Sequence, residues 1–215
     1  MERIYDANGL KPQDIEKRSF EIISEEMDLS SVPPEQVPII KRVIHATADF
    51  EFRNTLVFHP DAIKTGIDAI RAGKDILTDI EMVRAGINKR LLEKWGGRVI
   101  CSIQQSAFSH QQSEVKTKAE MGIESALKEN NNIGIIAIGN APTALLKVVE
   151  LFNQTLTPDP NPLVIGVPVG FVKALESKAL LSAQKFPFIT NLSRKGGTPV
   201  AVATVNALLK MAEGK

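Results

Sequence analysis

Cysteine is almost missing from this chain, which has Cys101 as its single thiol among 215 residues. One cysteine cannot form an internal disulfide, so an apolar core must hold the fold together, and a chain of this length can bury one. Cys101 stands in the apolar run RVICSI. That setting favours a small buried residue on a strand over a reactive thiol.

Long apolar runs and an excess of charge are also missing. No run approaches the roughly 18 apolar residues of a membrane helix, and the polar start MERIYDANGLKPQDIEK lacks the apolar segment of a signal peptide. We therefore expect a cytoplasmic protein with no membrane partner. The net charge of +1 and the pI near 7.8 predict no nucleic-acid surface. A local basic pocket for a small molecule with several negative charges stays open.

Several motifs of known chemistry are absent as well. The three histidines, His45, His59 and His110, have no H-x-x-x-H spacing, so we expect no metal site. Neither G-x-G-x-x-G nor G-x-x-x-x-G-K-[ST] follows any predicted strand, which disfavours a nucleotide cofactor. The G-x-S-x-G turn of serine hydrolases is missing too.

The chain does have short β-branched runs alternating with helical patterns. Predicted strands are 54–58, 75–79, 97–103, 132–140, 161–170 and 187–192. Predicted helices are 12–27, a second ending near the stretch 41–52, 60–73, 79–86, 112–129, 142–156, 171–184 and 198–214. Continuous apolar strands in this order are buried on both faces. We therefore predict one α/β domain over residues 1–215, a three-layer α/β/α sandwich with a mainly parallel sheet of about five strands.

Three loops of this fold have unusual sequences: IGNAPTAL at 138–145, IGVPVGFVKALESK at 165–178 and NLSRKGGTPVA at 191–201. Each begins at the carboxyl end of a strand, where ligands bind in doubly wound sheets. Glycine allows close approach to the backbone, and helix starts offer free N–H groups. Together the loops would suit a ligand with several carboxylates, although glycines at such turns also serve the turn alone.

The stretch KRVIHATADFEF at 41–52 poses the main question about a reactive residue. By itself, a histidine between Ile44 and Ala46 is more typical of a packed core residue than of a catalytic acid. Histidine is nevertheless the side chain that holds and releases a proton near neutral pH. Pattern alone leaves both interpretations of His45 open.

Six segments in order resemble one family closely. They are SFEII at 19–23, RVIHATADFEF at 42–52, MVRAGI at 82–87, IGNAPTAL at 138–145, IGVPVGFVKALESK at 165–178 and RKGGTPVAVATVNALL at 194–209. These segments resemble the precorrin-8X methylmutases, including the cobalt-precorrin-8 form, of corrin biosynthesis. The resemblance spans nearly the whole chain.

The resemblance implies an isomerase that moves a methyl group from C11 to C12 of a tetrapyrrole with several carboxylates, giving (cobalt-)cobyrinate or hydrogenobyrinate. It implies no cofactor of the protein's own, because any cobalt belongs to the substrate. It also implies a homodimer with the site near the subunit interface. The alternative is a corrinoid-binding or delivery protein of the same fold without turnover.

The resemblance also implies site residues. His45 matches the family's catalytic histidine. The substrate-binding residues it implies, directly or through the loops above, are Ser19, Arg42, Thr47, Asp49, Asn140, Ala141, Thr143, Gly170, Lys173, Lys178, Arg194, Lys195, Gly196 and Gly197. Alternatives remain: Arg42 could be a solvated helix-end residue, Asp49 could cap a turn, Lys178 could pair with Glu176 or a neighbour, and residues 194–197 could form a plain surface turn.

Two positions depart from the family pattern. After Gly122 the chain reads Ile123-Glu124-Ser125 where the family usually has an arginine, and Ala48 replaces a common glycine. The first departure implies a lost carboxylate or dimer contact, or one supplied by Lys116 or Lys118.

Overall fold

The computed structural model describes residues 11–103, 116–154 and 161–214. Six strands form one sheet in the order β1-β6-β5-β4-β2-β3. Their bounds are β1 Leu56–Phe58, β2 Asp75–Thr78, β3 Val99–Cys101, β4 Ile133–Ile138, β5 Leu163–Gly166 and β6 Phe188–Asn191. All neighbours are parallel except β1, which pairs antiparallel with β6 at one edge. The mainly parallel sheet is confirmed, with one strand more than the five expected.

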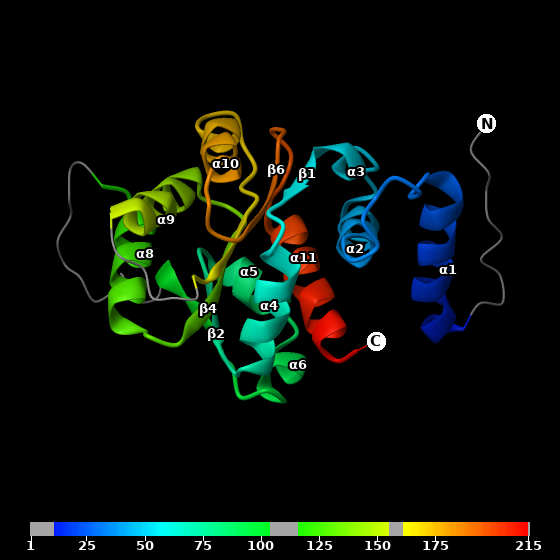
Figure 1. Ribbon diagram of the computed structural model, residues 1–215, viewed down its shortest axis with the longest axis horizontal. Helices are drawn as coiled ribbons and strands as arrows, with labels where there is room; N and C mark the ends of the chain where they lie inside the picture. The colour runs from blue at the N-terminus through cyan, green and yellow to red at the C-terminus, as the bar shows by residue number, and fades with distance from the viewer. Residues whose placement is uncertain (1–10, 104–115, 155–160, 215) are drawn as a thin grey trace.

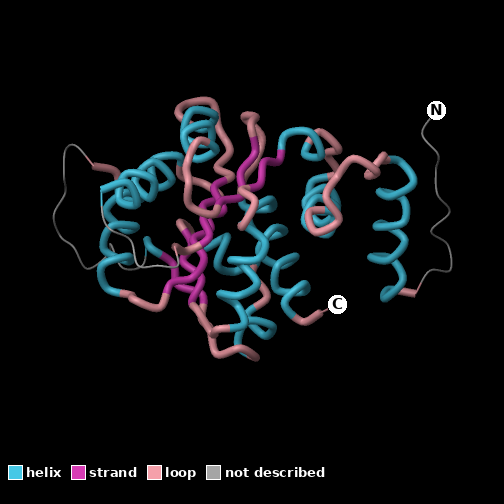
Figure 2. Tube along the Cα trace, in the orientation of Figure 1, coloured by secondary structure: helices cyan, strands magenta, loops and turns pink. Residues whose placement is uncertain are grey.

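Helices cover both faces of the sheet, as Figure 1 and Figure 2 show. On one face lie α2 (Val37–Thr47), α4 (Ala62–Arg71), α5 (Glu81–Gly86), α6 (Lys89–Glu93) and α11 (Thr198–Ala212). On the other face lie α8 (Lys118–Glu129), α9 (Pro142–Gln154) and α10 (Ala174–Ser182). The three-layer α/β/α arrangement predicted from sequence is therefore confirmed.

Alternate residues of a central strand face opposite layers of helices. Along β4, Ile135 and Ala137 face the layer of α11, whereas Ile136 and Ile138 face the layer of α9. Every residue of β4 is buried, which explains the continuous apolar run in the sequence. Cys101 is buried at the end of β3, as its sequence setting predicted.

One helix lies outside the layers that cover the sheet, and two short helices were not predicted. The helix α1 (Pro12–Glu26) packs on α2 and lies outermost on its side of the molecule (Figure 1). The short helix α3 (Phe52–Thr55) and the short α6 were not predicted, because four or five residues show no helical period. His110 and the predicted helix residues 112–115 and 155–156 lie outside the described residues.

Within the described ranges, none of the helices combines the length and the apolar content that a membrane crossing would demand.

Candidate functional site

β2, β4, β5 and β6 are parallel, so their carboxyl ends lie together at one end of the strands. The loops that follow β4, β5 and β6 are the three singled out in the sequence. Loop 192–197, between β6 and α11, packs on the loop after β5: Gly197 N–H donates to Val167 O at 2.7 Å, and Gly170 N–H donates to Arg194 O at 3.2 Å. Two of the three predicted loops therefore form one surface.

Gly196 shows why this surface needs glycine. A Cβ at this position would lie 2.3 Å from the carbonyl oxygen of Val167, and its φ of 149° is one that side chains disfavour. At Gly197, φ is 103°, and the residue precedes the first turn of α11. Gly196 is thus required by the packing of the two loops, and Gly197 by its backbone conformation, apart from any ligand.

His45 lies in the last turn of α2, four residues before Asp49, which pairs with Lys195 of loop 192–197. Ile39, Ile40, Val43 and Ile44 bury the inner face of the helix, so His45 is turned outward and is exposed. Its ring lies 5.1 Å from the ring of Phe20 on α1. His45 is therefore an exposed residue and not the packed core residue that a lone histidine in an apolar stretch first suggests.

Arg42 on α2 contacts α1, the helix that carries Ser19. The guanidinium of Arg42 lies over the Phe20 ring at 5.0 Å and pairs with Glu16 at 2.8 Å. The Ser19 hydroxyl donates to Ile15 O in the preceding turn of its own helix. Arg42 therefore has partners on α1 and is no freely solvated helix-end residue.

Asp49 joins the end of α2 to loop 192–197. Its carboxylate lies 2.6 Å from the Lys195 ammonium, which also lies 2.8 Å from Glu51. The Lys195 hydrogen bond lowers the pKa of Asp49, and the two carboxylates raise the pKa of Lys195. Asp49 also accepts the Glu51 N–H at 3.0 Å, so it both caps a turn and forms an ion pair. The Thr47 hydroxyl donates to Val43 O.

The turn after β4 lies beside this surface, because a Cβ on Gly139 would be 3.2 Å from Thr198 Cα. Its backbone, however, is not free for an anion. Asp79, buried after β2, accepts N–H groups from Gly139 at 3.1 Å, Asn140 at 2.7 Å and Ala141 at 2.8 Å. The backbone N–H groups of Asn140 and Ala141 are therefore already bound to a carboxylate of the protein, and a contact of these residues with substrate stays a prediction.

Asp79 was missed in the sequence, although an acidic residue directly after the apolar strand run DILT is a signal for such a role. Burial raises the pKa of the Asp79 carboxyl, and the three N–H bonds oppose that shift by stabilising the charged form.

Thr143 and Lys173 extend the surface toward α8. The Thr143 hydroxyl lies 3.0 Å from that of Thr117, which caps α8 in a capping box with Glu120. Lys173 precedes α10 in a left-handed conformation, with φ at 61°, and its charge is among those that lower the pKa of Glu120. Arg194, by contrast, stacks its guanidinium 5.6 Å from the Phe171 ring.

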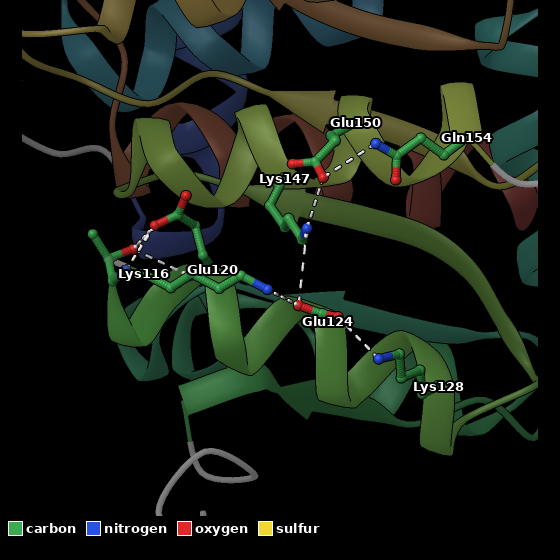
Figure 3. A network of polar contacts seen from close by, with 8 residues as sticks. Lys116, Glu120, Glu124, Lys128, Lys147, Glu150 and Gln154 are labelled. Atoms are coloured by element: carbon green, nitrogen blue, oxygen red, sulfur yellow. Dashed lines mark hydrogen bonds and ion pairs between the residues drawn. The ribbon is translucent and has the colours of Figure 1, made fainter. Parts of the chain in front are cut away.

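Glu124, where the family pattern has an arginine, is the centre of an ion-pair network between α8 and α9 (Figure 3). Its carboxylate lies 3.0 Å from Lys116, 2.9 Å from Lys128 and 3.9 Å from the buried Lys147. The hydrogen bonds from Lys128 and Lys116 lower the pKa of Glu124 to about 2. Lys116 is thus bound to the very residue that replaces the arginine.

Lys178 is the one predicted binding residue whose side chain is completely buried. It donates hydrogen bonds to Asn191, Ser193 and Lys195 and not to Glu176. It therefore binds the buried side of loop 192–197 and of the adjoining end of β6.

A hollow of about 430 Å³ lies at the opposite end of the strands, beside the residues where β2, β4 and β5 begin. Lys64, Lys74, Asn131 and Asn161 are among its lining residues, and no predicted site residue is. The described part of the chain holds no group of three or more histidine, cysteine, aspartate or glutamate side chains placed to bind a metal ion.

Comparisons with known proteins identify relatives of this chain. The family model described as precorrin-8X methylmutase matches residues 14–211. The cobalt-precorrin-8 methylmutase of Priestia megaterium is 46% identical, with 95% of this chain and 90% of that protein covered. Its counterpart in Salmonella typhimurium is 42% identical, with 93% and 95% covered.

A solved structure also matches over nearly the whole chain. The precorrin-8X methylmutase of Thermus thermophilus superimposes with a TM-score of 0.82 at 35% identity, covering 94% of this chain and 97% of that one. The chain therefore belongs to the precorrin-8X methylmutase family, isomerases of cobalamin biosynthesis that move a methyl group within one molecule.

Proposed function

We propose that the protein moves the methyl group from C11 to C12 of cobalt-precorrin-8 and releases cobalt-cobyrinate. The observation that carries this proposal is the outward-facing His45 in a chain of this family, four residues before Asp49, whose carboxylate pairs with Lys195 of loop 192–197. Preference for the cobalt form is supported by the names of the relatives in Priestia megaterium and Salmonella typhimurium.

His45 would act on the macrocycle as a proton donor and acceptor. A methyl shift around a conjugated ring needs electron density drawn toward a ring atom, and a proton placed on a ring nitrogen does this. Because the migrating group stays in one molecule, no redox cofactor is consumed. A positioned acid of this kind contributes about 10²–10⁴-fold to the rate, and holding the macrocycle in a reactive shape supplies more.

Cationic side chains around His45 would bind the substrate's carboxylates. Arg42 lies one turn before His45, and Arg194 and Lys195 are exposed on loop 192–197. Arginine can bind a carboxylate through two parallel hydrogen bonds. Arg42 would exchange Glu16 for the substrate, which leaves the number of its ion pairs unchanged.

A homodimer working in the cytoplasm completes the proposal. Phe171 is 83% and Val172 78% exposed on the loop after β5, beside the more modestly exposed Val169 and Leu175. Contiguous exposed apolar side chains favour association with another surface. A second copy of the chain would cover them and place the site near the interface.

The test is to follow the visible absorption of cobalt-precorrin-8 and of metal-free precorrin-8 mixed with the protein. Wild type is expected to produce a corrin spectrum, faster with cobalt. His45→Ala should bind the substrate but convert it at least about 10²-fold more slowly. His59→Ala is the matched control, because His59 lies before α4, outside the site, and should convert like wild type. If wild type binds both forms and converts neither, the protein is a binding or delivery protein.

A further inference from the structure

Lys178 is a long basic side chain with no solvent exposure. It lies on α10, in the layer that covers the face of the sheet opposite α11. Burying an ammonium group costs several kcal/mol unless hydrogen bonds and dipoles replace water, so a lysine in this position needs a compensating role. Burial lowers the pKa of Lys178 to about 8.

The three hydrogens of the ammonium have three acceptors. Nζ donates to Lys195 O at 2.7 Å, to Asn191 Oδ1 at 3.3 Å and to Ser193 O. All three acceptors belong to the end of β6 or to loop 192–197. The donor capacity of the ammonium is thus used entirely on this one segment.

A second set of bonds closes around the same atoms. Asn191 Nδ2 donates to Lys195 O at 2.8 Å and to Ser193 Oγ at 3.1 Å, and Lys195 N–H donates to Ser193 Oγ at 3.2 Å. Carbonyl groups of the loop are therefore turned inward to the ammonium. The side chains of Arg194 and Lys195 are left exposed on the outer side.

We propose that Lys178 is a positioning residue of the substrate site, whose buried ammonium fixes loop 192–197 in the conformation that presents Arg194 and Lys195. The inference rests on the proposed function, because it assigns these two cations to the substrate's carboxylates. Lys178 touches no substrate itself. It acts through Lys195, whose ammonium reaches Asp49 at the end of the helix that carries His45.

The experiment compares Lys178→Met with Lys185→Met. Methionine keeps an unbranched chain of similar length but has no charge and no donor. Lys185 is an exposed lysine just beyond α10, outside the site. Lys178→Met should raise KM for cobalt-precorrin-8 at least about tenfold, with kcat within threefold of wild type. The reason is that the loop binds the substrate equally well in the ground state and in the transition state, so its loss weakens binding without slowing the reaction step. Trypsin should cleave the folded variant after Arg194 or Lys195 faster than wild type. Lys185→Met should match wild type in both.

Each other outcome is informative. Wild type without turnover refutes the proposed function, whereas unchanged KM and unchanged cleavage in Lys178→Met refute only the positioning role. A fall in kcat with the loop still protected would make Lys178 a participant in the reaction, which also overturns the inference.

If Lys178→Met does not fold, hydrogen exchange of wild type decides. Corrected for intrinsic rates, exchange at residues 193–197 should increase as pH rises from 7 to 9.5, while exchange in β4 stays constant. Lys195, whose pKa is raised by Asp49 and Glu51, keeps its charge over this range. Constant protection of the loop would refute the role of the Lys178 ammonium.

Discussion

The ammonium of Lys195 lies 2.6 Å from Asp49, which joins loop 192–197 to the end of α2 across 146 positions of sequence. Both partners are partly exposed, so the pair should contribute less than about 1 kcal/mol to stability. Its larger effect should be on the site, because it fixes the loop relative to the helix that carries His45.

A double-mutant cycle tests this pair. Lys195→Met should raise KM about tenfold, since a charged hydrogen bond to substrate contributes about 1.5 kcal/mol or more. Asp49→Asn should raise KM less, and the double variant should fall short of the product of the two effects. Urea unfolding should change by less than about 1 kcal/mol in each variant. Fully multiplicative effects on KM would show that the two residues act independently.

The buried carboxylate of Asp79 organises the turn after β4, so its removal should destabilise the fold. Asp79→Ala leaves three N–H groups without their acceptor, at a cost of about 3 kcal/mol or more in the free energy of unfolding. Asp79→Asn should cost less, because its amide oxygen can still accept from part of this group. Denaturant unfolding measures both. Equal stability of the alanine variant and wild type would mean that water replaces the carboxylate.

Much of the fold, and less of the site, could be predicted from the sequence. Continuous runs such as IGIIAI specify strands buried on both faces, and glycine and proline mark the turns. The distant partners of Asp79, Lys178 and Asp49 could not be predicted, because they lie between 13 and 146 positions away and no local period reports them. The pattern around Lys178 is typical of a solvated helix face, and only tertiary packing makes this lysine buried.

Glu124 should make the free energy of unfolding depend on pH in the acidic range. Its pKa falls from the ordinary 4.5 to about 2 in the folded protein, so the unfolded chain binds its proton first as pH falls. The stabilisation is complete above about pH 5 and is lost progressively toward pH 2. After allowance for solvent screening, it amounts to roughly 1–2 kcal/mol.

The comparison of wild type with Glu124→Gln isolates this contribution. The difference in unfolding free energy should be largest near pH 6 and should shrink progressively as pH falls from about 5 toward 2. Glu176→Gln, an exposed position on α10, serves as the control and should show no such trend. A difference for Glu124→Gln that stays constant with pH would assign its effect to packing instead of charge.

The exposed apolar residues after β5 should control the oligomeric state. Phe171→Asp combined with Val172→Asp should convert a dimer into a monomer, because carboxylates in an apolar interface would be desolvated without partners. Sedimentation velocity measures this directly. Met82→Asp, at a residue 66% exposed on α5, is the control and should remain dimeric. A dimeric double variant would place the subunit contact elsewhere.

Gly196 and Gly96 offer a matched pair for separating steric fit from backbone strain. Both have a positive φ, 149° and 90°, but a Cβ on Gly96 meets nothing within 4 Å, whereas one on Gly196 would lie 2.3 Å from Val167 O. Gly96→Ala should therefore cost only the conformational strain, about 1–2 kcal/mol.

Gly196→Ala must also push apart the loops after β5 and β6, because a backbone oxygen cannot rotate away. We expect it to raise KM for cobalt-precorrin-8 at least about tenfold, a loss of about 1.4 kcal/mol of binding, with little effect of Gly96→Ala on KM. Similar KM values for both alanine variants would mean that the contact between the two loops is not needed to bind the substrate.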